Sequence, residues 1–117
     1  MPLIADYSII ADAVVLEKDK SVIDFTVPSN IHTGSRVLLG FMCSVDNNDD
    51  LLLRVRFNGT QVWSRNFESG NRTQFFLEVV QAGAVKPGAN NLSFISSSTD
   101  FNVVELSDIV IWWQANI

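Results

Sequence analysis

The chain of 117 residues contains one cysteine, one histidine and three prolines, and it has no long apolar run. A lone Cys43 excludes an internal disulfide and a cysteine-based zinc site, and its apolar surroundings (residues 37–43) predict a buried thiol. A membrane-spanning helix needs about 20 consecutive apolar residues. The N-terminal Met1-Pro2-Leu3-Ile4 also lacks the basic start of a signal peptide. We therefore expect no membrane partner, and no signal in the sequence assigns a compartment.

Positive charge is scarce as well. Eight Lys and Arg stand against thirteen Asp and Glu, which gives a formal charge of −5 at pH 7. An acidic protein is repelled by nucleic acids and by anionic membranes, so we expect neither as a partner. The basic residues are unevenly distributed, because Arg54, Arg56, Arg65 and Arg72 fall in one short stretch.

Apolar residues, in contrast, make up 47% of the chain, including eight Phe and three Trp. This length and composition predict one globular domain that spans residues 1–117. A domain this small has little interior, so the apolar surplus indicates that another chain covers part of its surface. We expect a homo-oligomer.

The apolar residues are rich in Val, Ile, Phe and Trp and are interrupted by turn residues every 8–12 positions or so, which is typical of short strands. In residues 5–16 the spacing of Ile9, Ala13 and Leu16 would also suit a helix, but Val14-Val15 favours a strand. The fold class is therefore all-β, a single antiparallel β-sandwich of about eight strands, of jelly-roll type. The expected strands cover residues 9–16, 21–27, 36–44, 51–57, 60–67, 73–80, 91–97 and 103–114.

The Asn58-Gly59 pair predicts a two-residue β-hairpin turn, because both positions of a type I′ turn need positive φ. Counting outward from the turn gives two faces. One face would pair Phe57 with Thr60, Val55 with Val62 and Leu53 with Ser64. The other would pair Arg56 with Gln61, Arg54 with Trp63 and Leu52 with Arg65.

The hairpin (residues 54–63) and the later stretch from Val85 to Phe94, which contains Pro87-Gly88-Ala89-Asn90, together resemble a recurrent pattern. The pattern is found in jelly-roll, galactose-binding-like domains that accompany glycoside hydrolases. The resemblance covers roughly 40 residues and implies the fold, with sugar binding as one activity of such domains. It identifies no binding residue in this chain.

The predicted hairpin face that carries Trp63 with Arg54, Arg56 and Arg65 is the main ligand candidate. Indole stacks on the apolar faces of sugars, and guanidinium groups donate paired hydrogen bonds to hydroxyls, carboxylates or sulfates. Two other interpretations are open: Arg54 covers the indole by stacking, or the face is a subunit contact.

Two strands are apolar on both faces, residues 37–43 and 103–114. A strand in a two-layer sandwich buries one face, so loops, a terminal segment or a second subunit must cover the other. Trp112 and Trp113 are adjacent and point to opposite faces of their strand. One belongs to the core and the other to a lid, an interface or a platform.

The loop from Asp46 to Asp50 contains Asp46, Asp49 and Asp50, and such a density of hard oxygen ligands is suited to calcium. The loop lacks the spacing of an EF-hand, so a solvated turn is the competing interpretation. Beyond this calcium candidate we expect no cofactor.

Catalytic groups are sparse. His32 is the only histidine, and Cys43 lies on another predicted element, which argues against a nucleophile–base pair. Glu78, Glu105 and Asp108 could be glycosidase carboxylates only if a cleft brought two of them face to face. We therefore expect a non-catalytic binding or assembly module rather than an enzyme. Its partner would be a glycan or anionic ligand, and the alternative is a structural subunit of a homo-oligomer without a small-molecule ligand.

Overall fold

The computed structural model describes residues 3–15, 20–97 and 104–116. These residues form eight β-strands and no helix. In this part of the chain, no helix is long and apolar enough to cross a membrane. The strands are β1 (Leu3–Val15), β2 (Lys20–Val27), β3 (Val37–Asn47), β4 (Leu51–Phe57), β5 (Thr60–Phe67), β6 (Gly70–Val80), β7 (Gly88–Ser96) and β8 (Val104–Asn116).

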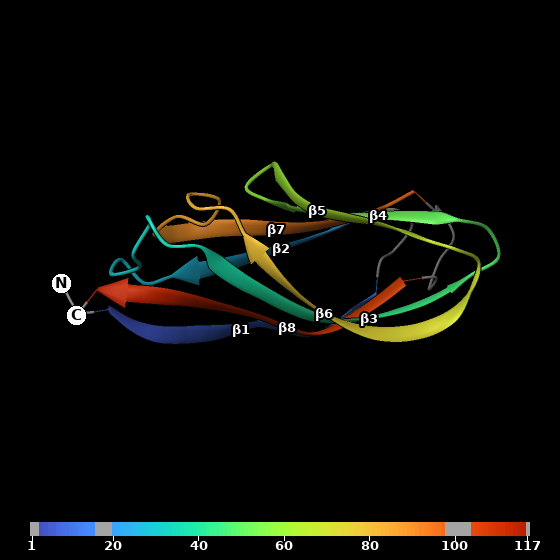
Figure 1. The fold of residues 1–117 in the computed structure, drawn as a ribbon, viewed down its shortest axis with the longest axis horizontal. Helices are drawn as coiled ribbons and strands as arrows, with labels where there is room; N and C mark the ends of the chain where they lie inside the picture. Colours follow the sequence, from blue (N-terminus) through green and yellow to red (C-terminus); the bar gives the residue numbers. More distant parts are fainter. Residues whose placement is uncertain (1–2, 16–19, 98–103, 117) are drawn as a thin grey trace.

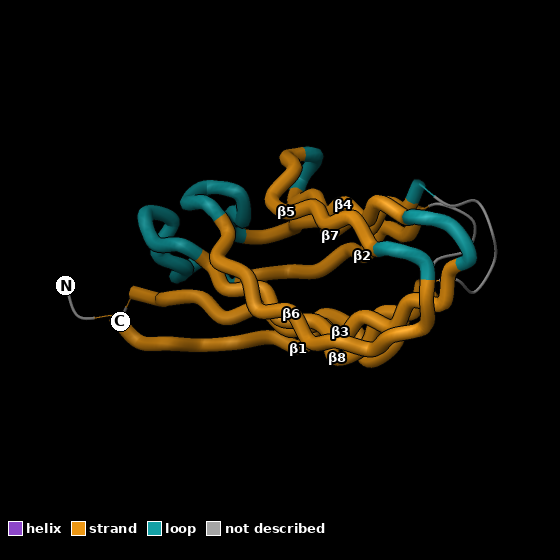
Figure 2. The backbone as a smooth tube through the Cα atoms, turned by 45° about the vertical axis from the view of Figure 1, so that its right-hand side comes forward, coloured by secondary structure: helices purple, strands orange, loops and turns teal. Residues whose placement is uncertain are grey.

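The described strands build two four-stranded antiparallel sheets that pack face to face (Figures 1 and 2). Sheet A has the order β1-β8-β3-β6, and sheet B has the order β2-β7-β4-β5. Apart from the β4–β5 hairpin, each connection carries the chain from one sheet to the other. This is the jelly-roll arrangement, and it confirms the predicted fold class. The molecule is elongated, with extents of 51 × 21 × 21 Å.

The core lies between the sheets and is rich in aromatic rings. Phe41, at the middle of β3, is fully buried. Its ring centroid lies 5.4 Å from those of both Trp63 and Phe94 and 5.5 Å from that of Phe76. The contacts with Trp63 and Phe94 are edge-to-face, a geometry that adds to the free energy gained by burying the rings. Cys43, two residues along the same strand, is also buried, as predicted.

The predicted Asn-Gly turn is confirmed, with φ of 51° at Asn58 and 83° at Gly59. The Asn58 side chain also ties this turn to the one before β7. Its Nδ2 donates to Asn90 Oδ1 and to the Ala84 carbonyl, both at 2.9 Å, while its Oδ1 accepts from the Asn91 amide. The two sequence segments that carry the family resemblance are thus held together by hydrogen bonds.

Most predicted strand positions agree with the structure. The choice of a strand over a helix for residues 5–16 is correct for its described residues, but β1 begins at Leu3, six residues before the predicted start, and Leu16 lies outside the described residues. The strands β6 and β7 begin three residues earlier than predicted, at Gly70 and Gly88. Both glycines have positive φ, a conformation that other residues rarely adopt. They read as turn residues in the sequence, whereas in the structure each begins a strand.

Candidate functional site

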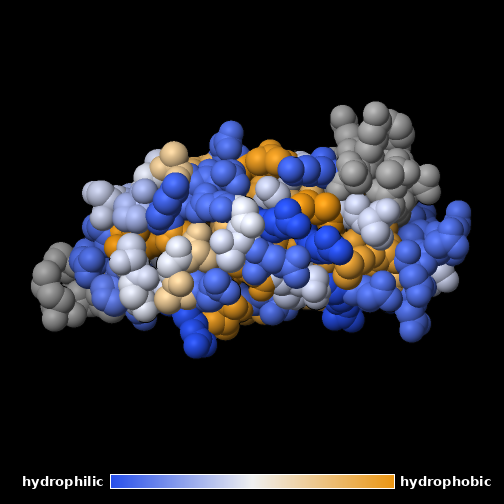
Figure 3. Space-filling model, turned by 90° about the horizontal axis from the view of Figure 1, so that it is seen from above, coloured by the Kyte–Doolittle hydropathy of each residue, from blue (hydrophilic) through white to orange (hydrophobic). Residues whose placement is uncertain are grey.

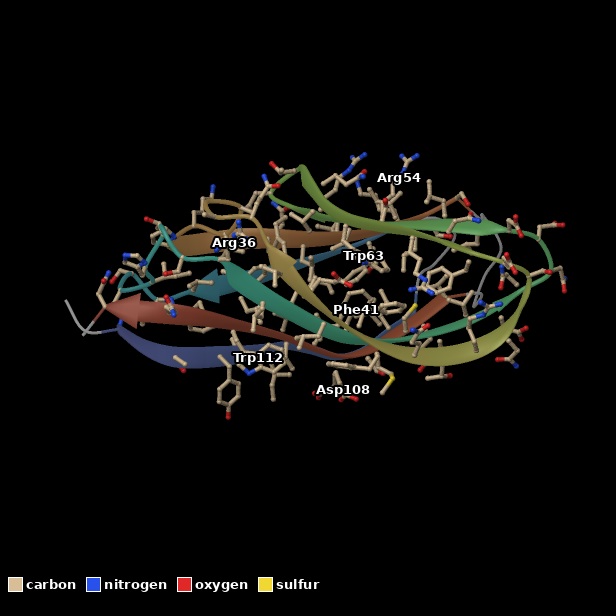
Figure 4. All side chains as sticks on the ribbon, viewed as in Figure 1. Arg36, Phe41, Arg54, Trp63, Asp108 and Trp112 are labelled. Carbon is tan, nitrogen blue, oxygen red and sulfur yellow. The ribbon has the colours of Figure 1, made fainter. Side chains whose placement is uncertain are left out.

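The predicted pairing of Arg54 with Trp63 is wrong. The β4–β5 register shifts between Val55 and Arg56, so that Trp63 lies opposite Val55 and Arg54 lies opposite Ser64. A β-bulge of this kind moves every later side chain to the other face of the strand. Trp63 therefore points between the sheets toward Phe41, while Arg54 lies on the outer side of sheet B (Figure 4).

Of the predicted arginines, the structure places Arg65 near Trp63. Both side chains lie on the inner side of β5. They are at the edge of the sandwich where β5 of sheet B faces β6 of sheet A without pairing to it. The Arg65 guanidinium lies 5.2 Å from the ring centroid of Phe76 and 5.6 Å from that of Phe67, within the range of a cation–π contact. The Trp63 ring packs against Phe76 at 5.1 Å. Tilted and edge-to-face ring contacts and the Arg65 cation–π contact hold this edge together. Arg54 and Arg56 are separated from it by the sheet.

The acidic loop does not gather its carboxylates. No group of three or more acidic, histidine or cysteine side chains that could hold a metal exists among the described residues, which include Asp46, Asp49 and Asp50. Asn47 shapes this region: its Nδ2 donates to the Asp49 and Phe67 carbonyls. Calcium binding by the loop stays a prediction, for which a change of melting temperature on adding calcium or chelator is the test.

The candidate catalytic residues are spread out. Glu78 shares the inner side of β6 with the buried residues Phe76 and Val80. Glu105 and Asp108, in contrast, are exposed residues of β8. His32 bonds within its own turn, with Nδ1 2.6 Å from Ser35 Oγ. Among the described residues no carboxylate is hydrogen-bonded to this ring.

The outer surface of sheet A is the most unusual part of the molecule. Cross-strand pairing places apolar side chains of all four strands side by side on it. We call this set the sheet A apolar face. It consists of Tyr7, Ile9, Leu38, Met42, Phe75, Leu77, Val79, Val110 and Trp112.

Gly40 lies at the centre of this face and explains how the aromatic rings lie on it. A Cβ atom at Gly40 would meet Trp112 Cζ3 at 2.8 Å and Phe75 Cζ at 2.9 Å. The two rings therefore converge over the bare glycine backbone from neighbouring strands. This close approach of the rings to the backbone requires glycine. The two rings thus lie close against the outer surface of the sheet.

A pocket of about 450 Å³ opens beside Trp112, toward the end of the sheet where β8 finishes. Leu38 and Trp112 are its large apolar lining residues, and two further lining residues, Arg36 and Gln114, have side chains that can donate hydrogen bonds. We call it the Trp112 pocket. It is lined by Ala5, Ser35, Arg36, Leu38, Trp112, Trp113 and Gln114.

The polar side of the Trp112 pocket is held by a chain of hydrogen bonds. Ser35 Oγ donates to Gln114 Oε1 at 2.6 Å and lies 2.6 Å from His32 Nδ1. The His32 amide donates to the Gln114 carbonyl at 2.8 Å. With Gln114 Oε1 engaged by Ser35, the amide nitrogen of Gln114 is left as a donor for a ligand. A wall fixed before binding reduces the entropy lost when a ligand binds.

The sequence identified part of this site. Of the adjacent tryptophans, Trp113 is 4% exposed and belongs to the core, while Trp112 is half-buried on the exterior. The two-sided apolar strands predicted an outer apolar face that loops, a terminal segment or a second subunit must cover, and in the described chain large apolar side chains of this face are exposed. Arg36, Ser35 and Gln114 were not predicted, because no motif connects positions that only the pairing of β3, β8 and the preceding turn brings together.

Comparisons with known proteins support the fold. A scan against protein-family models and a search of curated proteins gave no match. Dimeric latent PorU from Porphyromonas gingivalis is similar over 99% of this chain and 13% of its own, with a TM-score of 0.74 and 11% identity. BuGH86 in complex with neoagarooctaose is similar over 96% of this chain and 18% of its own, with a TM-score of 0.64 and 14% identity.

A third similar structure is nearer in length. The EclA C-terminal domain, a sugar-binding protein, is covered over 79% of its chain and covers 95% of this one, with a TM-score of 0.57 and 10% identity. At these identities the likeness establishes the fold alone. The resemblance to jelly-roll, sugar-binding-like domains is thereby confirmed at the level of the fold.

Proposed function

We propose that this chain is a non-catalytic carbohydrate-binding module whose sugar site is the Trp112 pocket. The observation that carries the proposal is the pocket itself, about 450 Å³ in volume, which combines an accessible indole with donors from Arg36 and Gln114. Small-ligand sites have this make-up, mainly apolar walls with a few placed polar groups. The fold shared with sugar-binding domains supports the same function.

The chemistry of the pocket favours a sugar over a purely apolar ligand. An indole surface suits the C–H face of a pyranose ring, and the guanidinium and amide groups suit its hydroxyls. Arg36 would also pair with a carboxylate or sulfate, because guanidinium bonds such groups in a bidentate manner. Both neutral and acidic oligosaccharides are therefore reasonable probes.

The test is titration of the protein with neutral and acidic oligosaccharides, followed by calorimetry. We expect Trp112→Ala to weaken binding at least about tenfold and Arg36→Ala about three- to tenfold. Trp63→Phe is the matched control: it keeps an aromatic ring in the core and alters the other tryptophan candidate. Arg54→Ala and Arg56→Ala are further controls, which test whether the outer side of sheet B contributes to sugar binding.

Two results would overturn the proposal. One is no binding to any neutral or acidic glycan by the wild-type protein. The other is binding that survives Trp112→Ala but is lost in Trp63→Phe or Arg54→Ala, which would move the site to the β4–β5 hairpin.

A second candidate function, a structural subunit of a homo-oligomer, is favoured by a different observation. The sheet A apolar face has more exposed apolar side chains than sugar binding at one end of it requires. The oligomeric state in solution tests this candidate.

A further inference from the structure

The sheet A apolar face exposes six large apolar side chains. Their exposed fractions range from 36% for Leu38 to 60% for Tyr7. On the outer side of sheet B, Val22 is the only comparably exposed large apolar residue among those the structure describes. Figure 3 shows the sheet B side of the molecule, where hydrophilic residues are interspersed with apolar areas. The apolar surplus of the sequence is thus concentrated on one face.

The size of this face is close to what a stable dimer needs. The six exposed fractions amount to about three whole side chains, two of the six being aromatic and four aliphatic. At about 150–200 Å² for each whole side chain, the face leaves on the order of 500–600 Å² of apolar surface in water. That is at the upper end of the roughly 300–600 Å² of the largest patch on a typical monomer. Two such faces in contact would bury on the order of 1,000–1,200 Å², near the lower end of the roughly 1,200–2,000 Å² of stable interfaces.

Charges at the two sides of the face complement each other. Arg36 precedes Leu38 at one end, while exposed Asp108 lies beyond Val110 in the other direction along the strands. Asp108 projects from the outer side of sheet A (Figure 4). Within the described residues neither Arg36 nor Asp108 has an ion-pair partner.

We propose that a second copy of this chain packs on the sheet A apolar face, about a two-fold axis that runs across the strands between Trp112 and Val110. A two-fold interface joins a patch to itself, so it must be self-complementary. This axis brings Arg36 of each copy toward Asp108 of the other. An axis along the strands would instead bring like charges together, which costs free energy. The proposal goes beyond sugar binding and does not depend on it.

The first test is the mass in solution. We expect sedimentation or light scattering to give 26 kDa, twice the chain mass of 13.0 kDa, at about 100 µM protein. Val79→Glu and Leu77→Glu place a charge on the face and should weaken the dimer at least about tenfold. Val22→Glu is the matched control, because Val22 and Val79 are 53% and 56% exposed on opposite sheets. Circular dichroism checks that each variant is folded.

The second test is a charge exchange. Arg36→Glu alone and Asp108→Arg alone should each weaken the dimer, and the double variant should restore it at least partly. A monomer at every concentration, or a dimer that survives Leu77→Glu, would overturn the second copy as occupant of this face. A double variant weaker than both single variants would overturn the axis across the strands.

Discussion

Asn90 holds the turn before β7 with one side chain. It is 4% exposed, and its amide makes four hydrogen bonds, to Lys86 N, Lys86 O, Gly88 O and Asn58 Nδ2. All polar atoms of this amide are therefore satisfied inside the protein. The Asn of the Pro-Gly-Ala-Asn segment therefore has a structural role. This explains why the segment indicates the fold but identifies no ligand-binding residue.

Asn90→Ala should lower the free energy of unfolding by about 2–4 kcal/mol, since a lost hydrogen bond costs about 1 kcal/mol and the buried partners are left unpaired. Denaturant unfolding measures this loss. Asn66→Ala, an exposed change on β5, is the control and should stay within about 0.5 kcal/mol. Equal effects of the two changes would contradict the role given to the Asn90 network.

Cys43 links stability to alkaline pH. Burial raises the pKa of its thiol from 9.0 to about 12. The neutral thiol is thus favoured in the folded state, so its stabilising contribution is complete below about pH 9. The contribution is lost as pH rises from about 9 toward 12.

We therefore expect the wild-type protein to lose more stability between pH 7 and about pH 10.5 than Cys43→Ala does, because alanine has no proton to release. Denaturant unfolding at both pH values measures the difference. Identical losses in the two proteins would show that the thiol does not couple to unfolding.

Among the strands, the β4–β5 hairpin shows where sequence reasoning succeeded and where it failed. The turn at Asn58-Gly59 followed from backbone chemistry and was correct. The pairs Phe57–Thr60 and Arg56–Gln61 and the buried face of β4 were also correct. The faces of the β5 residues beyond Val62 were wrong, because nothing in the residues around Val62 signals an extra residue in β5. A bulge depends on how the strand fits its neighbours, and this one brings Trp63 opposite Val55 and Ser64 opposite Arg54.

Gly59→Ala tests the turn in isolation. No atom lies within 4 Å of a Cβ at this position, so only the backbone φ of 83° opposes the change. The substitution should cost about 1 kcal/mol or more, while Gly59→Asn should cost less because asparagine tolerates positive φ. Thermal or denaturant unfolding of both variants checks the order. An alanine variant as stable as the wild type would contradict the turn geometry.

For the whole molecule, the fold was predictable because alternation, turn spacing and strand propensity all pointed to one architecture. The Trp112 pocket was not, since residues 5, 35–38 and 112–114 meet only through strand pairing. The two-sided strands predicted a second apolar face on residues 37–43 and 103–114, but its exposure and its extent over β1 and β6 came from the structure.

The two proposals are linked, because the pocket and the apolar face share Leu38 and Trp112 and the dimer axis brings the partner's Asp108 toward Arg36. Oligosaccharide and second copy should compete, so the apparent sugar affinity should fall as protein concentration rises through the dimer range. Calorimetry at several protein concentrations measures this. An affinity independent of protein concentration would contradict the shared surface.

The most direct test of the central claim uses the three tryptophans as reporters in a ¹⁵N nuclear magnetic resonance titration with an oligosaccharide that binds. Trp112 lies in the pocket, Trp63 at the β5–β6 edge and Trp113 in the core. We predict that the indole N–H signal of Trp112 shifts most and that of Trp63 stays nearly unchanged. A large shift of the Trp63 signal with a stationary Trp112 signal would contradict sugar binding in the Trp112 pocket.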